Sequence, residues 1–203
     1  MTEPGRRLII LRHGRTGYNA SGRFQGQLDE PLDDVGCEQA RAVAPVIAAM
    51  HPTALVSSDL RRAADTARCI ADLTGLPLPL HAGLREIDLG TWSGCTGREA
   101  AELYPDEFAA WLRGEDVRRG DGETYAEVAD RALAVLEPLV ASQEPGGLVV
   151  AVTHGGTSRS ITGGWLGWAP ESWHSLGAVG NCEWGELREG RVGWRLQRWG
   201  MSA

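Results

Sequence analysis

The stretch LIILRHGRTGYN, residues 8–19, decides how the rest of the chain is interpreted. Residues 8–11 form an uninterrupted aliphatic run, which predicts a buried strand. Arg12 and His13 follow directly, and Gly14 comes after them. Two interpretations are open: the histidine is an ordinary polar residue at a strand edge, or the fold places a reactive imidazole beside a fixed positive charge.

Predicted strands and helices alternate along the remainder of the chain. Further strands are expected at 54–57, 77–80 and 148–153, and the last is a valine-rich run typical of a strand buried on both faces. Helices are expected from about Asp33, from a cap at Ser58-Asp59 to about Thr74, over 124–140 and over 156–166.

This alternation predicts an α/β fold, a three-layer α/β/α arrangement with a mainly parallel central sheet. Short helices around Pro105 predict a small helical insertion, about residues 93–120, over the active site at one end of the sheet. The polar segment 14–31 is expected to be a loop, and the C-terminal end a hairpin turning at Glu189-Gly190. Because no internal repeat is evident, residues 1–203 are expected to form a single domain.

Composition narrows the class of protein. The 203 residues carry a formal net charge of −7, so nucleic-acid and membrane-surface partners are not expected. No stretch approaches the roughly 18 apolar residues of a membrane span, and the first apolar run is too short for a signal peptide. The four cysteines lie far apart without a C-x-x-C pair, which predicts a reduced cytoplasmic protein.

Charged and reactive residues follow each predicted strand, where parallel α/β sheets bind their ligands. Arg12-His13-Gly14 ends the first strand, and Thr153-His154-Gly155-Gly156 ends the late one. Segment 57–62, which contains Arg61 and Arg62, follows the second strand, and Leu84-Arg85-Glu86 follows the third. If these segments converge, the site holds two imidazoles, two guanidinium groups and one carboxyl group. Two histidines in equivalent positions, each before a glycine, favour the functional interpretation of His13.

That set of groups suits phosphoryl transfer to a histidine. Such a site must position an in-line nucleophile and neutralise the phosphoryl oxygens, which a planar guanidinium binds bidentately. Nearby arginines lower the pKa of a histidine and leave one ring nitrogen free to attack phosphorus. Glu86 is placed to give the leaving alkoxide a proton. No metal or other cofactor is expected, and the expected partner is a small-molecule phosphoester.

Five blocks resemble, in order, the signature of the histidine phosphatase (phosphoglycerate mutase-like) superfamily. They are segments 12–19 with 23–26, 57–63, 84–94, 122–124 and 153–156. The resemblance runs from about residue 6 to residue 160. A single R-H-G is a weak signal, whereas five ordered blocks are specific.

The resemblance implies a role for each matching residue. It makes His13 the nucleophile that becomes phosphohistidine, and Glu86 the proton donor to the leaving group and then the base that activates water. It places Arg12, Arg62 and His154 in the phosphate pocket. Around the substrate it places Asn19, Gln25, Gly26 and the backbone amide of Gly155.

Several other side chains are interpreted without a catalytic role. Arg15 departs from the glutamate common at that position in the family and is expected to point into solvent. Arg61 is expected to be solvated, since only one of two adjacent arginines readily faces inward. Arg118 and Arg119 are assigned to an exposed loop, with a place at the pocket mouth as the alternative. The tryptophan-rich tail is a candidate homodimer surface.

Hydrolysis is favoured over phosphoglycerate mutase activity. Cofactor-dependent mutases resemble the chain around His13 but follow the acid glutamate with Arg-His-Tyr, whereas Ile87-Asp88-Leu89 follows Glu86 here. The expected activity is a metal-independent phosphomonoesterase acting through phosphohistidine. Segments 18–19, 25–29, 180–181 and 194–196 resemble the actinobacterial glucosyl-3-phosphoglycerate phosphatase family, so the expected substrate is glucosyl-3-phosphoglycerate or a range of small phosphoesters. The alternative of another class is a non-catalytic phosphate-binding or interaction protein, which needs neither nucleophile nor acid.

Overall fold

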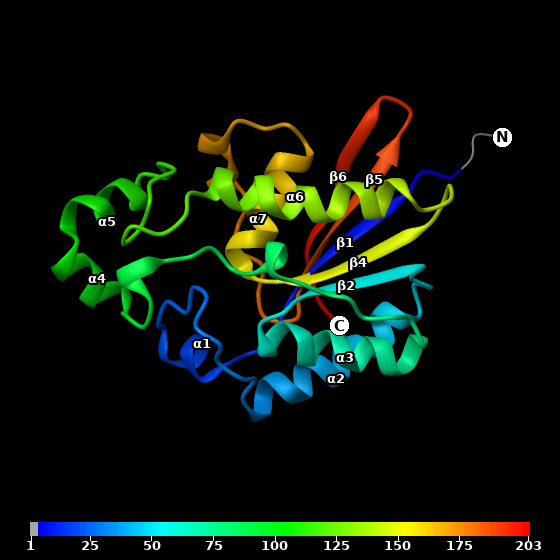
Figure 1. Cartoon of the computed structure of the whole chain (residues 1–203), viewed down its shortest axis with the longest axis horizontal. Helices are drawn as coiled ribbons and strands as arrows, with labels where there is room; N and C mark the ends of the chain where they lie inside the picture. Colours follow the sequence, from blue (N-terminus) through cyan, green and yellow to red (C-terminus); the bar gives the residue numbers. More distant parts are fainter. Residues whose placement is uncertain (1–3) are drawn as a thin grey trace.

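A six-stranded sheet forms the centre of the protein, seen in a computed structural model that describes residues 4–203 (Figure 1). The strand order is β3-β2-β4-β1-β5-β6. Strands β1 to β4 are parallel, whereas β5 runs antiparallel to β1 and β6 antiparallel to β5. The strands are β1 (Arg7–Arg12), β2 (Ala54–Ser58), β3 (Leu80–His81), β4 (Leu148–Thr153), β5 (Trp184–Gly190) and β6 (Gly193–Met201).

Helices cover both faces of the sheet, which confirms the three-layer α/β/α prediction. On one face lie α2 (Asp34–Ala48) and α3 (Arg61–Thr74), and on the other lie α6 (Tyr125–Ala141) and α7 (Gly155–Trp165) (Figure 1). Two parallel strands need a crossover connection such as a helix, because the chain must return to the end of the sheet at which the first strand began.

The helix ends follow local sequence chemistry. The Asp33 side chain accepts a hydrogen bond from the Gly36 amide at the start of α2, and Thr124 forms a capping box with Glu127 at the start of α6. Helix α3 ends at Gly75, which has a φ of 68° in the left-handed region that favours glycine.

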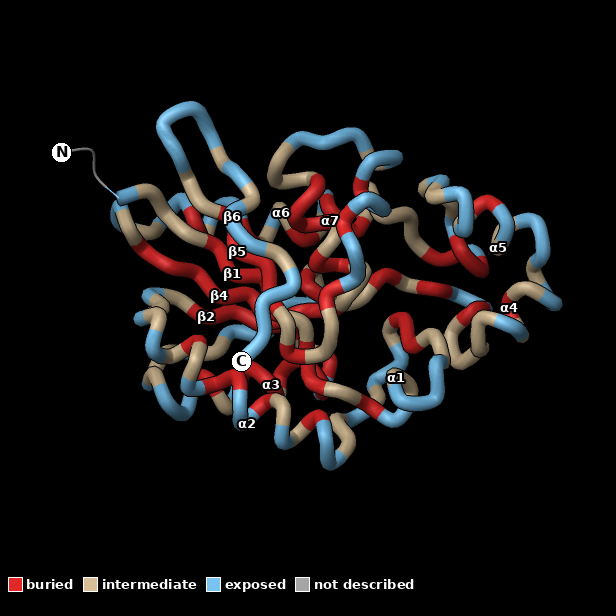
Figure 2. Tube along the Cα trace, turned by 180° about the vertical axis from the view of Figure 1, so that it is seen from behind, coloured by how far each residue is buried: buried red, intermediate tan, exposed pale blue. Residues whose placement is uncertain are grey.

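The core lies on both sides of the parallel strands. Successive side chains of β1 point to opposite faces, so Ile9 and Leu11 pack in the cluster that includes α2 and α3, while Leu8 and Ile10 pack in the cluster that includes α6. All six residues of β4 are buried, and Figure 2 shows the central strands as the most continuous buried region. Fully burying an aliphatic side chain contributes about 1.5–3 kcal/mol. The residues that follow β1 and β4 are therefore attached to a rigid base.

The helical insertion lies beyond the carboxyl ends of the parallel strands (Figure 1). It contains α4 (Gly97–Leu103) and α5 (Pro105–Leu112), consistent with the short helices expected around Pro105. Its own small core is aromatic: Phe24, Tyr104, Phe108 and Trp111 surround the fully buried Trp92.

Four local predictions were wrong or incomplete. The predicted 14–31 loop contains a one-turn helix, α1 (Gly17–Ser21), held by a capping box between Thr16 and Asn19. The third strand has only two residues, 80 and 81, because its predicted start contains two prolines that cannot donate to a sheet ladder. The terminal hairpin turns two residues later than expected, at 191–192. The N-cap of α3 is Leu60 rather than Ser58-Asp59, since those two side chains bind other partners.

The tryptophans near the C-terminus pack within the chain. Trp184 is buried, the ring of Trp194 lies 5.1 Å from that of Trp165, and Trp199 donates to the Gly177 carbonyl. A homodimer through this tail stays a prediction. None of the helices in residues 4–203 has the length and apolarity needed to span a membrane.

Candidate active site

The register of two parallel strands brings the two motif histidines together. Arg12, at the end of β1, pairs with Thr153, at the end of β4. The His13 amide then donates to the Thr153 carbonyl at 3.0 Å, and the His13 and His154 rings lie with their centroids 5.0 Å apart. Both imidazoles are almost completely buried.

Hydrogen bonding determines which ring nitrogen of His13 is free. Its Nδ1 lies 2.6 Å from the Gly14 carbonyl oxygen, which only accepts, so Nδ1 carries the proton in the neutral ring. Nε2 is then the unprotonated nitrogen, and it accepts a hydrogen bond from Arg62 Nε at 3.2 Å. The pKa of His13 lies well below the ordinary value of 6.5, because of burial first and then the charges of Arg62 and Arg12. The site therefore holds a neutral imidazole with its basic nitrogen directed at a guanidinium.

Two arginines provide the positive charge. Arg62, fully buried at the start of α3, donates to the carbonyls of Leu28 and Gly26. Burial lowers its pKa to about 10, so it is charged at neutral pH. Arg12 donates to the Val179 carbonyl, and its buried Nε has no partner within the described chain. Burial also lowers the pKa of Arg12, an effect that the nearby Glu86 partly offsets.

Glu86 is held at the start of α7. Its Oε1 accepts hydrogen bonds from the Ile87 amide and from the amide and hydroxyl of Thr157, and its Oε2 accepts from the Gly156 amide. Backbone donors thus fix the carboxyl group in one orientation. Its charge also raises the pKa values of Arg12 and Arg62, against the lowering effect of burial, so the three groups interact electrostatically.

His154 is oriented by the end of a neighbouring strand. Its Nε2 lies 2.9 Å from the Ser58 hydroxyl at the end of β2, and its Nδ1 is buried without a partner in the described residues. Burial, followed by the charges of Arg62, His13 and Arg12, places the pKa of His154 well below 6.5.

The buried histidines predict acid sensitivity. Because the folded pKa values of His13 and His154 are lowered, the unfolded chain binds more protons below pH 6.5, and stability falls as the pH falls. Between pH 7 and 5 we expect the free energy of unfolding to decrease by up to about 1.4 kcal/mol per pH unit for each histidine. Urea unfolding at several pH values measures this slope. In His13→Gln, the free energy of unfolding should change less steeply with pH than in the wild-type protein. An unchanged slope would contradict the assignment of neutral imidazoles.

A cavity of about 170 Å³ joins most of these residues. Of the residues predicted for the site, those lining it are Arg12, His13, Asn19, Gln25, Gly26, Arg62 and Glu86. His154 and Gly155 lie outside the lining, and Gly156 takes the wall position expected of Gly155. Asn19 is held in place by Asn181, whose side-chain amide also donates to the His13 carbonyl.

Of the two adjacent arginines at 61 and 62, only one faces inward, as predicted. Arg61 is exposed and pairs with Asp29 at 3.0 Å, whereas Arg62 faces inward. Arg15 lies outside the cavity lining, but it is paired with Asp33 rather than free in solvent.

The exposed-loop prediction was wrong for Arg119, whose position agrees with the alternative of a place at the pocket. Arg118 is exposed and paired with Glu127, but Arg119 is only 3% exposed and lines the cavity. No sequence pattern distinguishes the two arginines, because the loop conformation and the contacts with Trp111 and Tyr125 decide which one turns inward.

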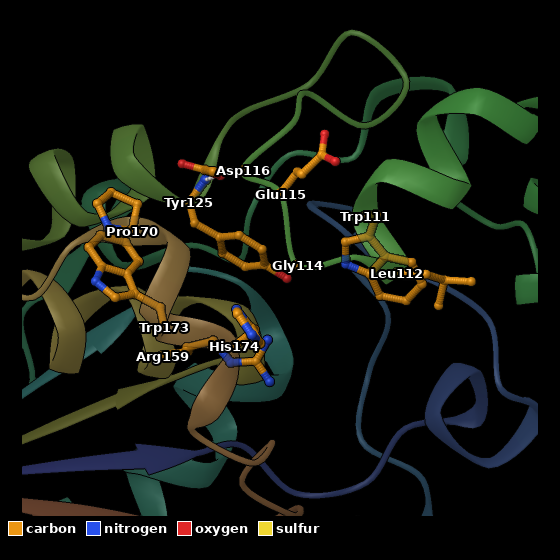
Figure 3. A pocket seen from close by; sticks show the side chains of 10 residues that line it. All are labelled: Trp111, Leu112, Gly114, Glu115, Asp116, Tyr125, Arg159, Pro170, Trp173 and His174. Carbon is orange, nitrogen blue, oxygen red and sulfur yellow. Dashed lines mark hydrogen bonds between the residues drawn. The ribbon is translucent and has the colours of Figure 1, made fainter.

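A second cavity, of about 290 Å³, shares Tyr125 with the first. Figure 3 shows the rings of Trp111, Tyr125 and Trp173 around it, together with the side chain of Arg159. Aromatic walls with a few polar groups are typical of small-molecule sites.

The family model of the histidine phosphatase superfamily (branch 1) matches residues 8–202. The chain belongs to the histidine phosphatase superfamily. Its relatives within that superfamily include a glucosyl-3-phosphoglycerate phosphatase of Mycolicibacterium vanbaalenii, 41% identical over 98% of this chain and 96% of the relative. They also include a metal-independent phosphoserine phosphatase of Arabidopsis thaliana, 37% identical over 76% of this chain and 66% of the relative.

Solved structures show the same histidine phosphatase fold. The mycobacterial glucosyl-3-phosphoglycerate phosphatase in complex with VO3 superimposes with a TM-score of 0.92 at 38% identity, covering 97% of this chain and all of that one. The similarity therefore includes the insertion and the C-terminal hairpin, beyond the five sequence blocks.

Proposed function

We propose that His13 is the nucleophile of this phosphoric monoester hydrolase and that Glu86 is its acid and base. The observation that carries the proposal is the unprotonated Nε2 of His13, held beside Arg62 in a cavity that Glu86 also lines. A binding protein needs neither a free imidazole nitrogen nor a carboxyl group at this place. The enzyme is a metal-independent phosphomonoesterase acting through phosphohistidine.

The reaction has two steps. The first step starts from protonated Glu86: the Nε2 lone pair attacks phosphorus, the bond from phosphorus to the ester oxygen breaks, and Glu86 gives its proton to that oxygen and becomes a carboxylate. In the second, Glu86 takes a proton from water, the water oxygen attacks phosphorus, and the bond to Nε2 breaks to release phosphate. Arg12 and Arg62 stabilise the charge on the equatorial oxygens in both steps. His154 lies against His13 and contributes to the same phosphate pocket.

The proposed substrate is glucosyl-3-phosphoglycerate. The extent of the sequence matches supports this substrate. The phosphatases named for that compound match the chain almost end to end, whereas the match to the phosphoserine phosphatase covers about two thirds of that relative. The second cavity gives room beyond the phosphate for a bulky group, and aromatic faces suit the apolar faces of a sugar ring. We further propose that residues 1–203 act as one catalytic domain, while the cytoplasmic location stays a prediction.

A substrate panel tests this proposal. In the presence of EDTA, we expect the enzyme to hydrolyse p-nitrophenyl phosphate. We expect kcat/KM for glucosyl-3-phosphoglycerate to be at least about 100-fold higher than kcat/KM for p-nitrophenyl phosphate, since binding of the remote groups lowers the barrier only for the matched substrate. The panel includes phosphoserine, and 3-phosphoglycerate with and without 2,3-bisphosphoglycerate. A preference for phosphoserine would contradict the substrate, and formation of 2-phosphoglycerate would indicate a mutase. Binding of these esters without any turnover would indicate a phosphate-binding protein.

A further inference from the structure

The chain contains only two asparagines, Asn19 and Asn181, and their side chains contact each other. Nδ2 of Asn181 lies 3.1 Å from Oδ1 of Asn19, although the two residues are 162 positions apart in the sequence. Asn19 lines the cavity that holds His13, whereas Asn181 lies outside that lining. Asn181 can therefore act on a ligand in this cavity only through another residue.

Backbone groups determine which end of each amide faces the other. An asparagine side chain accepts hydrogen bonds through its oxygen and donates them through its NH2 group. The His13 carbonyl only accepts, so the Asn181 group that lies 3.1 Å from it is the NH2 group. The Thr16 backbone N–H only donates, so the Asn19 atom that lies 3.3 Å from it is Oδ1. The two hydrogens of Asn181 Nδ2 thus have two acceptors, the His13 carbonyl and Asn19 Oδ1.

The NH2 group of Asn19 is left for the cavity. Its oxygen accepts from Thr16 and Asn181, while its Nδ2 forms no hydrogen bond to any of residues 4–203. Asn19 lines the cavity together with Arg62. A hydrogen-bond donor held at this place stabilises the oxygens of a phosphoryl group, whereas an amide turned by 180° would present its own oxygen and repel them.

The turn that carries Asn181 is fixed to the end of β1. The Cys182 amide donates to the carbonyls of Arg12 and His13, at 3.1 and 3.2 Å. Cys182 is buried and has a φ of 56°, in the left-handed region that a cysteine rarely adopts. Such a conformation persists only where the surrounding contacts impose it, and here the hydrogen bonds to β1 do so. The position of Asn181 is thus coupled to the strand end that carries His13.

We propose that Asn181 is a positioning residue, which fixes the amide of Asn19 with its NH2 group toward the phosphoryl group of the substrate. The inference rests on the proposed phosphate site but on no step of the proposed reaction. The two ends of an amide are similar in size and opposite in hydrogen-bonding character, so partners rather than packing must select the orientation. Without Asn181, only the hydrogen bond from Thr16 would oppose the reversed amide.

A nuclear magnetic resonance titration of the wild-type protein tests the orientation directly. Asparagine labelled with ¹⁵N in its side chain gives two amide signals, and the spectrum of Asn19→Ala identifies each one. Inorganic phosphate should shift the Asn19 signal, because this NH2 group gains a charged acceptor. The Asn181 signal should change little, because both of its hydrogens are already bonded within the chain. An unchanged Asn19 signal, or a larger shift for Asn181, overturns the inference.

Calorimetric titration with inorganic phosphate measures the coupling between the two asparagines. Asn181→Asp keeps the size of the side chain but only accepts, so the Asn19 amide should turn its NH2 group toward the new carboxylate. We expect the Kd for phosphate to rise about 100-fold in Asn181→Asp and about 10-fold in Asn181→Ala.

The same two substitutions are then made in Asn19→Ala, which has no amide to orient. There we expect Asn181→Ala to change the Kd less than about threefold, and Asn181→Asp to raise it at least about ten times less than in the wild-type background. The effect of the added charge is common to both backgrounds, so the difference reports the amide alone. Gln143→Glu makes the same change from amide to carboxylate at the opposite end of β4 and should leave the Kd unchanged.

These measurements involve no turnover, so they separate the inference from the proposed chemistry. Absence of hydrolysis or of phosphohistidine in the wild-type enzyme bears only on the proposed function. Equal effects of the Asn181 substitutions in the two backgrounds overturn the inference, as does a loss of thermal stability without any change in phosphate affinity. A wild-type protein that binds no phosphate overturns it as well. If Asn181→Asp does not fold, Asn181→Ala and the wild-type titration still decide.

Discussion

His13→Ala is expected to lower kcat for p-nitrophenyl phosphate by about 10⁵-fold, to the limit of detection. The substitution removes Nε2, the atom that we propose attacks phosphorus, and no other described side chain in the cavity offers an unprotonated imidazole nitrogen next to Arg62. Loss of a nucleophile in covalent catalysis has effects of this size. The measurement is steady-state hydrolysis in EDTA, with substrate well above KM.

The control for this substitution is another histidine. His81 is exposed on β3 and lies outside the cavity, so His81→Ala should keep full activity. Circular dichroism and thermal unfolding must show that His13→Ala is folded, because the substitution also leaves the Gly14 carbonyl and Arg62 Nε without their partner. Activity within tenfold of wild type in a folded His13→Ala protein would rule out the mechanism.

The loss of activity in Glu86→Gln is expected to depend on the leaving group of the substrate. An alkyl phosphate leaves as a poor alkoxide that needs a proton, so kcat/KM for glycerol 3-phosphate should fall by about 10²- to 10⁴-fold. p-Nitrophenolate is a stable anion and needs little protonation, so kcat/KM for p-nitrophenyl phosphate should fall at least ten times less. Since kcat/KM reports the steps up to the first irreversible one, this comparison isolates the formation of phosphohistidine.

Glutamine retains most of the local hydrogen bonds at position 86. Its oxygen can still accept from Thr157 and Ile87, and only the bond to the Gly156 amide is lost. Glu102→Gln, at an exposed position of the insertion, is the matched control and should leave both substrates unchanged. An equal fall for the two substrates would show that Glu86 positions the site rather than donating a proton.

The convergence of the candidate site residues could be predicted because it depends on features that are local in sequence. Each key histidine stands directly after a strand whose aliphatic run is visible, and parallel strands place such positions at one edge. The pairing of Arg12 with Thr153 then brings His13 and His154 together. Glu86 was predicted in the same way, from its place after the third strand, although hydrogen bonds from the backbone of α7 hold its side chain in place.

The missed features depend on contacts distant in sequence or on loop conformation. Arg119 turns inward because Tyr125 and Trp111 receive its guanidinium, and no periodicity in residues 113–124 indicates which of two adjacent arginines does so. The α1 helix was missed because its five residues contain two poor helix formers, glycine and serine, and its stability comes from the Thr16 and Asn19 capping box.

The most direct test of the central claim is to trap the covalent intermediate. Wild-type enzyme is mixed with excess substrate, quenched within milliseconds at alkaline pH where phosphohistidine survives, digested and examined by mass spectrometry. The account predicts a phosphoryl group on the peptide that contains His13, assigned to that residue, and none on the same peptide of His13→Ala. Turnover without any phosphorylated protein, or a phosphoryl group on a different residue, would contradict it.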